Sequence, residues 1–227
     1  MEKTDSVITF ENVTKNYGSL PILNSLSFEI REHDVVGVLG PSGVGKTTVL
    51  KLIADLTQPS SGTIKKISGR IGYVFQEPRL LPWRTAVDNV SLPLQAMGIR
   101  RQIARKNASG WLSRMGLDKF SDYYPAHLSG GMLQRISLAR ALALQPKILL
   151  MDEPFSALDV RLKEDMLSLI RAQLSEHPIT VLYVSHIPDE VIMIATRIFL
   201  LAHNGDFKEL PITDRSELLE KLKNACR

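Results

Sequence analysis

The chain has 227 residues, 44% of them hydrophobic and 23% charged, with a formal net charge of +4. This composition is ordinary for a globular protein, and so mild a charge gives no argument for nucleic-acid binding. No apolar run approaches the ~20 residues that span a bilayer, and the polar start, Met1–Asp5, predicts no signal peptide. The single cysteine, Cys226, excludes an internal disulfide and fits a reducing compartment.

Short stretches rich in apolar and β-branched residues recur along the chain. They predict buried strands at Val35–Leu39, Ile71–Phe75, Ile148–Met151, Val181–Val184 and Ile198–Leu201. Helical patterns lie between several of these stretches, which favours a mainly parallel sheet covered by helices. Nearer the N-terminus, Ile8–Phe10 and Phe28–Ile30 flank turn-rich segments, and we expect them to form an antiparallel β-subdomain.

The stretch from about Pro78 to Ala143 has long helical patterns and no convincing strand, so it predicts a helical subdomain. After Asn204-Gly205 only a short tail follows, in which one polar helix is expected near Ser216–Lys223. We therefore predict an α/β fold for a single domain over residues 1–227. Its parts are a core of about residues 1–76 and 144–227 and a helical subdomain inserted at about 77–143.

A glycine-rich motif follows the first predicted buried strand and matches the phosphate-loop pattern G-x-x-x-x-G-K-[ST]. It consists of Gly40, Pro41, Ser42, Gly43, Val44, Gly45, Lys46 and Thr47, and a helix-competent run, Thr48–Leu56, comes next. Glycines let backbone N–H groups curl around phosphate oxygens, and the helix N-terminus adds a positive dipole. We expect Lys46 to reach the β- and γ-phosphates, Thr47 to bind magnesium and Thr48 to reach the α-phosphate.

Two adjacent acids, Asp152 and Glu153, follow the predicted strand Ile148–Met151. Open α/β sheets bind ligands at the carboxyl ends of their strands, so this position suits a nucleotide site. We expect Asp152 to hold magnesium, directly or through water. Glu153 points elsewhere, and its expected work is to polarise or deprotonate the attacking water.

The stretch Leu128-Ser129-Gly130-Gly131 opens an amphipathic segment between the phosphate loop and the acidic strand end. Motifs in this order resemble the ATP-binding subunits of ATP-binding-cassette (ABC) transporters, from roughly Val7 to Leu201. The resemblance implies a phosphate-loop ATPase that uses ATP and Mg²⁺ and works as a head-to-tail homodimer. It also implies that the signature residues Ser129, Gly130 and Gly131 complete the ATP site of the partner copy.

Four further residues acquire a role from the same resemblance. Tyr17 resembles the aromatic residue that stacks on adenine, and Gln76 the glutamine that touches magnesium and the attacking water. Asp159, in Ser156–Asp159, resembles the acid of the loop that crosses the dimer, and His186 the histidine near the γ-phosphate. Considered alone, a tyrosine or a histidine at such positions has an ordinary structural explanation.

Two positions depart from the family pattern. The fifth residue of the signature is usually Gln and is Met132 in this chain, which we expect to have at most a tuning effect. After His186 the family commonly has Asp, whereas this chain has Ile187. The substitution therefore bears on how His186 is oriented, not on its presence. Neither departure touches Lys46 or Glu153, and we predict an active ATPase.

The run Glu77–Trp83 is similar to that of importers of nitrate, sulfonates such as taurine, bicarbonate and thiamine precursors. The resemblance implies a separate integral-membrane permease that contacts this run, an external solute-binding protein that acts indirectly, and a peripheral location on the cytoplasmic face of the membrane. Leu80, Leu81 and Trp83 suit a groove for an amphipathic helix, and they also suit packing of the helical subdomain. The sequence does not name the transported solute.

Other functions of an ABC ATPase need comparison with import. A DNA-repair or translation ATPase would carry a coiled-coil insertion or tandem cassettes, for which 227 residues leave no room. An assembly module, such as one for iron–sulfur clusters, fits less well because of the run Glu77–Trp83. An exporter cassette is the main alternative among transport functions, but such cassettes are often fused to membrane spans, and this sequence has no apolar run long enough for one. The basic run Arg100–Lys106 has the spacing of a solvated helix face, so we infer no function from it and expect no nucleic-acid partner.

Overall fold

The structure is a computed structural model that describes residues 6–156, 158–176, 178–202, 207–211, 218–220 and 222. Chain contacts divide it into two compact units. The first comprises Met1–Gly69, Leu150–Glu153 and Pro178–Arg227, and the second comprises Arg70–Leu149 and Pro154–His177. The predicted helical region, residues 77–143, falls inside the second unit. The assignment of a core and an inserted subdomain to particular residues stays a prediction.

The first unit contains a three-stranded antiparallel sheet with the order β2-β1-β4. Its strands are β1 (Ser6–Tyr17), β2 (Leu20–Arg31) and β4 (Ser61–Lys66). Ile8 pairs with Ile30 and Phe10 with Phe28, whose rings stack with centroids 4.4 Å apart. The predicted antiparallel sheet near the N-terminus is therefore confirmed, and it is held by alternating apolar side chains on one face.

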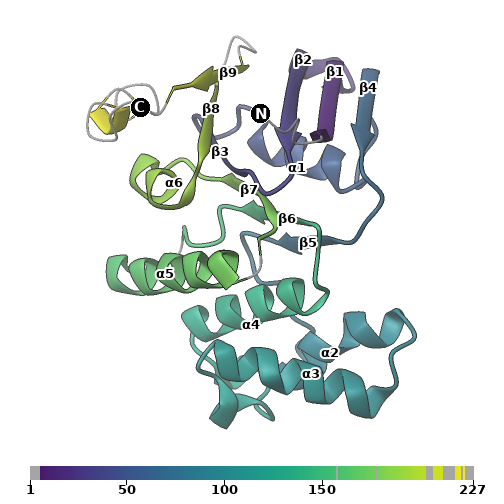
Figure 1. The fold of residues 1–227 in the computed structure, drawn as a ribbon, viewed down its shortest axis with the longest axis vertical. Helices are drawn as coiled ribbons and strands as arrows, with labels where there is room; N and C mark the ends of the chain where they lie inside the picture. The colour runs from purple at the N-terminus through teal and green to yellow at the C-terminus, as the bar shows by residue number, and fades with distance from the viewer. Residues whose placement is uncertain are drawn as a thin grey trace. The chain divides into compact units, whose positions relative to one another are not determined.

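A second, six-stranded sheet has the order β5-β6-β7-β3-β8-β9 (Figure 1). Its strands are β3 (Val35–Leu39), β5 (Ile71–Val74), β6 (Ile148–Asp152), β7 (Thr180–Val184), β8 (Arg197–Leu201) and β9 (Phe207–Leu210). β3 pairs in parallel with β7 and β8, whereas β9 pairs antiparallel with β8. Every residue of β3, β6 and β7 is buried, as expected for parallel strands covered on both faces. The predicted mixed α/β fold is confirmed.

Two helices of the first unit pack on this sheet. They are α1 (Lys46–Ile53), which directly follows β3 and contacts β7, and α6 (Pro188–Ile194), which contacts β3. Of the predicted tail helix, Ser216–Lys223, residues 218–220 and 222 are helical and the others lie outside the described residues.

The second unit is mainly helical (Figure 1). Its α-helices are α2 (Ala86–Ala96), α3 (Arg101–Arg114), α4 (Gly130–Ala143) and α5 (Val160–Glu176), with short 3₁₀ turns η1 (Asp118–Phe120) and η2 (Pro125–His127). Helix α4 contacts α2, α3 and β5 and is buried along most of its length, so it is the central element of this unit. Over the described residues, every helix is too short or too polar to cross a membrane.

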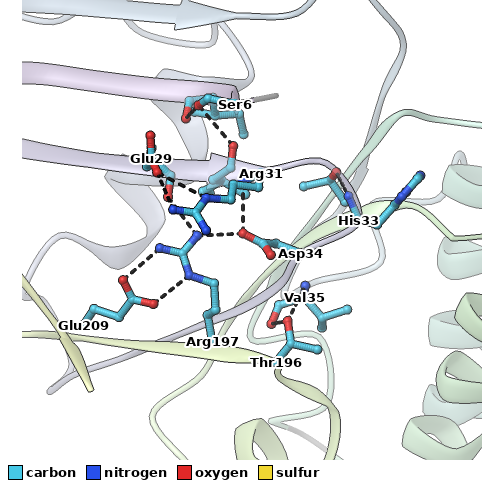
Figure 2. A network of polar contacts seen from close by, with 12 residues as sticks. Ser6, Glu29, Arg31, His33, Asp34, Val35, Thr196, Arg197 and Glu209 are labelled. Carbon is cyan, nitrogen blue, oxygen red and sulfur yellow. Dashed lines mark hydrogen bonds and ion pairs between the residues drawn. The ribbon is translucent and has the colours of Figure 1, made fainter. Parts of the chain in front are cut away.

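The short strand β9 was not predicted, and a group of ion pairs explains how it is held (Figure 2). Arg197 of β8 donates two hydrogen bonds to the carboxylate of Glu209, at 2.6 and 2.8 Å, and one to Asp34 at 2.6 Å. The hydrogen bonds from Arg197 lower the pKa of Glu209, and those to Glu209 raise the pKa of Arg197. Phe207–Leu210 has no apolar run of its own. It is a strand because it pairs antiparallel with β8, where Phe207 also stacks on Phe199 with ring centroids 4.9 Å apart.

Candidate nucleotide-binding site

The predicted phosphate loop joins the end of β3 to the start of α1, as its motif requires. Gly43 and Gly45 have φ values of 80° and 110°, in the region that favours glycine. A Cβ on Gly45 would lie 2.8 Å from the side chain of Leu23, whereas nothing lies within 4 Å of the corresponding position on Gly43. The loop thus packs tightly beneath Gly45 and stays open beside Gly43.

The backbone of this loop presents a row of unused hydrogen-bond donors. Within the described residues, the N–H groups of residues 43–48 have no acceptor, and the N-cap of α1, Gly45, supplies no side chain to them. Backbone donors are seldom left unpaired unless water or a ligand accepts from them. Together with the helix dipole, these converging donors form a cradle for phosphate oxygens.

Lys46 lies in the same loop with only 5% of its side chain exposed. Its Nζ donates to the carbonyl oxygens of Gly40 and Pro41, each at 2.8 Å, and lies 3.4 Å from a carboxylate oxygen of Glu153. These contacts fix the position of the ammonium group beside the phosphate loop. A buried, oriented cation beside the loop donors suits a phosphate.

Thr47 and Asp152 are brought together although 105 positions separate them in the sequence. The hydroxyl of Thr47 donates to Asp152 Oδ1 at 2.8 Å, and Asp152 is buried at the end of β6. Over the described residues there is no cluster of three or more His, Cys, Asp or Glu side chains that could hold a metal by themselves. One hydroxyl and one carboxylate beside a phosphate cradle are nevertheless the donor set that Mg²⁺ uses when phosphates and water complete its shell.

Glu153 forms a pair with His186 in the same unit. One carboxylate oxygen lies 2.7 Å from His186 Nδ1 and the other lies 3.4 Å from Lys46 Nζ, while the Glu153 side chain is 14% exposed. Glu153 has a φ of 43°, which a non-glycine residue adopts at an energetic cost, and its N–H donates to Val184. This backbone turns Glu153 away from Asp152, so the two adjacent acids face different partners.

The turn that carries His186 has a buried support that the sequence did not suggest. Glu190 accepts hydrogen bonds from Tyr183 and Ser185 at 2.7 and 2.9 Å, and Ser185 in turn accepts from the N–H of Ile187 at 3.0 Å. Burial and the nearby Glu190 raise the pKa of Tyr183. These bonds fix the backbone on both sides of His186 although Ile187 replaces the usual Asp. A glutamate four residues after the histidine, on the buried face of α6, was the available signal.

The signature residues lie in the second unit, at the N-terminus of α4. Ser129 is the N-cap, exposed, and its hydroxyl accepts from the N–H of Met132 at 3.3 Å. Gly130 and Gly131 form the first turn, at the positive end of the helix dipole, and within the part of the chain that the structure describes their N–H groups have no acceptor. Gly131 is buried and packs against Leu162 of α5, a contact that the sequence did not predict.

The two glycines of the signature are expected to respond oppositely to substitution. A Cβ on Gly131 would clash with the side chain of Leu162, whereas a Cβ on Gly130 would meet nothing within 4 Å. We expect Gly131→Ala to lower the free energy of unfolding by about 1–2 kcal/mol through overpacking. Gly130→Ala should leave it unchanged or raise it, because Ala favours helix over Gly. Urea unfolding of both variants measures these changes in the free energy of unfolding. Adding Leu162→Ala should reduce the destabilisation caused by Gly131→Ala. Equal destabilisation at both glycines would contradict the overpacking explanation.

The remaining predicted residues have separate surroundings. Gln76 follows β5, is exposed, and donates to Ser156 at 3.4 Å in the second unit. Asp159 precedes α5 and accepts from the N–H of Leu162 at 2.9 Å, while Ala157 of the same loop lies outside the described residues. Tyr17 ends β1 with 47% of its surface exposed, and the ammonium of Lys15 lies 4.9 Å from its ring centroid.

The fold and this site define a phosphate-loop, nucleotide-binding protein. The model of the family described as "ABC transporter" matches residues 23–156. The chain therefore belongs to the ABC transporter family, as the order of its motifs predicted. Within this family it is an ATPase that binds ATP and Mg²⁺, which fit the donor cradle and the Thr47–Asp152 pair.

Several relatives are import proteins. A Chlorella vulgaris protein named as a probable sulfate/thiosulfate import ATP-binding protein is 39% identical, over 96% of this chain and 95% of its own length. An aliphatic sulfonates import ATP-binding protein of Agrobacterium fabrum is 39% identical, over 85% of this chain and 70% of its own. An Fe(3+) ions import ATP-binding protein of Brucella abortus is also 39% identical and covers 87% of this chain, which spans 59% of that protein.

Solved structures agree with the fold. A dimeric ATP-binding cassette in a post-hydrolysis state, bound to ADP and phosphate, has a TM-score of 0.82 and 32% identity, covering 91% of this chain and 99% of its own. This identity and coverage connect the chain to a cassette whose structure contains the products of ATP hydrolysis.

Proposed function

We propose that this chain is the ATP-hydrolysing subunit of an ABC importer and that it energises solute uptake through a separate permease. Nucleotide binding is supported by the backbone N–H groups of residues 43–48, which have no acceptor within the described residues. Lys46, held by the carbonyl oxygens of Gly40 and Pro41, lies in the same loop. In this proposal the phosphate loop, Gly40–Thr47, and Thr48 bind the phosphates, and Tyr17 stacks on adenine. Thr47, Gln76 and Asp152 hold Mg²⁺, which supplies charge neutralisation for the phosphate oxygens when bound.

Glu153 is the residue we propose to act on water. Its carboxylate is largely enclosed and is oriented by the ammonium of Lys46 and the ring of His186. A carboxylate held in this way can accept a proton from an attacking water or align it, which is the usual task of a general base. His186 would sense the γ-phosphate and keep Glu153 in place, and the Glu190–Ser185 bonds would keep His186 in place.

The site is proposed to be complete only in a dimer of two copies. Ser129, Gly130 and Gly131 present a hydroxyl and helix N–H groups at the N-terminus of α4, which suits an anion, and the described first turn contains no acidic residue. The solved relative that is dimeric and binds ADP and phosphate supports this arrangement. Asp159 would contribute where the two copies meet.

The import part of the proposal depends on residues 76–85, which we name the coupling segment. Trp83 in this segment is 68% exposed, an unusual position for a tryptophan, and exposed aromatic residues are common anchors in protein interfaces. Asn89 of α2 braces the segment: it accepts from the N–H of Leu81 at 2.7 Å and donates to the carbonyl oxygens of Leu81, Arg84 and Thr85. A braced segment that exposes a tryptophan beside arginine residues suits an amphipathic helix of a permease.

The proposed solute is a small anion of the nitrate, sulfonate or taurine type, in line with the run Glu77–Trp83 and the sulfonate-importing relative. Other relatives are named for sulfate and for iron, so ATP-binding subunits of similar sequence serve different solutes. Selectivity would reside in the permease and in an external solute-binding protein, and this chain would sit peripherally on the cytoplasmic face of the membrane.

Purification with the membrane fraction tests this proposal. The tagged chain, expressed with the genes that neighbour its own, should retain an integral-membrane protein in mild detergent, and its ATPase rate should rise in that complex. Trp83→Ala should weaken retention, whereas Trp111→Ala, a change of the same residue type on α3, should not. Retention of a soluble scaffold protein, with no membrane protein, would contradict the import function and leave the ATPase assignment intact.

A further inference from the structure

The coupling segment leaves β5 through a backbone turn that is strained. Arg79 has a φ of 47°, in the left-handed region that glycine tolerates and other residues adopt at a cost. Its guanidinium lies 4.3 Å from the ring centroid of Phe75, and Phe75 stacks on Tyr73 at 4.1 Å. Strained residues persist only where neighbouring structure holds them, so a second interaction is needed to keep this turn.

Helix α4 supplies that interaction through two side chains. Arg140 donates from Nη1 to the carbonyl oxygen of Arg79 at 2.9 Å and from Nη2 to that of Pro78 at 2.7 Å. Six residues earlier on the same helix, the buried Gln134 donates to the carbonyl oxygen of Phe75 at 3.3 Å. The carbonyl groups on both sides of Gln76 are therefore held by the helix that begins at the signature.

The surroundings of Arg140 indicate that this contact is specific. Burial lowers the pKa of Arg140, and over the described residues its guanidinium has backbone carbonyl partners and no carboxylate. A largely buried cation without an ion-pair partner is costly, and the planar fork of arginine satisfies two adjacent carbonyl groups in a way that lysine cannot. An apolar side chain would suffice at this place if only packing were needed.

We propose that Arg140 is a positioning residue that holds Pro78 and Arg79 so that the coupling segment moves as one piece with the signature helix. This inference rests on the proposed function, because the segment is taken to contact a permease. A displacement of the coupling segment is then transmitted along α4 to Ser129 at its N-terminus, because the turn at Pro78 and Arg79 does not flex. The same link would carry closure of the signature back to the permease.

The test uses the full chain with Arg140→Gln and Arg140→Lys. Arg135→Gln is the matched control, because Arg135 lies on the same helix and donates to a different carbonyl group, that of Met115. Hydrogen exchange in the peptide of residues 77–85 should become at least about tenfold faster in Arg140→Gln, since local opening is no longer opposed. It should change little in Arg135→Gln. Arg140→Lys should fall between, because its single nitrogen can reach one of the two carbonyl groups but lacks the planar fork that holds both.

Two further readouts separate positioning from general stability. In the complex with the permease, the ratio of stimulated to free ATPase rate should fall at least about fivefold in Arg140→Gln and stay unchanged in Arg135→Gln. Adding Arg79→Asn should restore much of the exchange protection, because Asn adopts the left-handed region at less cost.

Unchanged exchange and an unchanged ratio in Arg140→Gln would overturn the inference. Faster exchange spread evenly over all of α4 would also overturn it, since that result indicates a general packing role. If the wild-type chain itself shows no stimulation by a permease, the proposed function fails, while the exchange result still decides whether Arg140 holds the segment.

Discussion

Replacing Glu153 by Gln is expected to slow ATP hydrolysis by about 10²–10⁴-fold, the usual contribution of a positioned general base. Gln keeps the size of the side chain and its hydrogen bond toward His186 but cannot accept a proton from water. The phosphate loop, Lys46 and the Thr47–Asp152 pair are untouched, so ATP should still bind. The measurements are phosphate release under saturating ATP and, separately, binding of a fluorescent ATP analogue.

A dimer trapped with ATP is the second expectation for this variant, because closure needs the γ-phosphate and reopening needs its loss. Size-exclusion chromatography with ATP should show dimer for Glu153→Gln and mainly monomer for wild type after turnover. Glu176→Gln, an exposed change at the end of α5, should behave as wild type. A turnover rate for Glu153→Gln within about twofold of wild type would exclude Glu153 as the base.

Ser129→Arg is expected to abolish ATP-driven dimer closure while leaving ATP binding by the monomer. Ser129 is exposed and caps α4, so a long cation there disturbs the unit itself little, apart from the lost cap, which costs about 1 kcal/mol. In the proposed closed dimer, however, that position would face the nucleotide of the partner, and we expect the longer arginine side chain to obstruct closure. Light scattering with and without ATP, in a Glu153→Gln background, measures closure directly.

The control for this variant is Ser113→Arg, which places the same charge on an exposed position of α3 in the same unit. It should dimerise with ATP as the parent does. Normal ATP-dependent dimerisation of Ser129→Arg would mean that the signature is not part of the active site.

The parts predicted from sequence are those with local signals. The strand Val35–Leu39 and the loop Gly40–Thr47 form one contiguous pattern of apolar residues, glycines and a lysine, so their order alone predicted the turn from β3 into α1. The antiparallel pairing of Ile8–Phe10 with Phe28–Ile30 followed from two short apolar runs near turns. These features depend on neighbours in the chain, which a sequence displays.

The parts that were not predicted are side-chain contacts, and most of them join residues far apart in the sequence. The contact of Gly131 with Leu162 gives that glycine a packing reason beside its proposed contact with phosphate. The hydrogen bonds of Glu190 compensate for Ile187, and those of Arg140 hold a strained residue, Arg79. The spacing of Glu190 from His186 was the only local signal among these contacts. The contacts of Gly131 and Arg140 have none, because Leu162, Pro78 and Arg79 come near them only in the folded chain.

Mixing two inactive variants tests most directly that one active site is built from two copies. Lys46→Ala removes the cation from the phosphate loop, and Ser129→Arg blocks the signature, so each homodimer has two damaged sites. In a head-to-tail heterodimer both defects fall in the same site, and the other site is intact. We predict that the mixture hydrolyses ATP at a rate well above the sum of the two separate proteins. In an equal mixture with random pairing the rate should be about one quarter of wild type, because half of the dimers are heterodimers with one intact site of two. A mixture no more active than that sum would contradict the shared site.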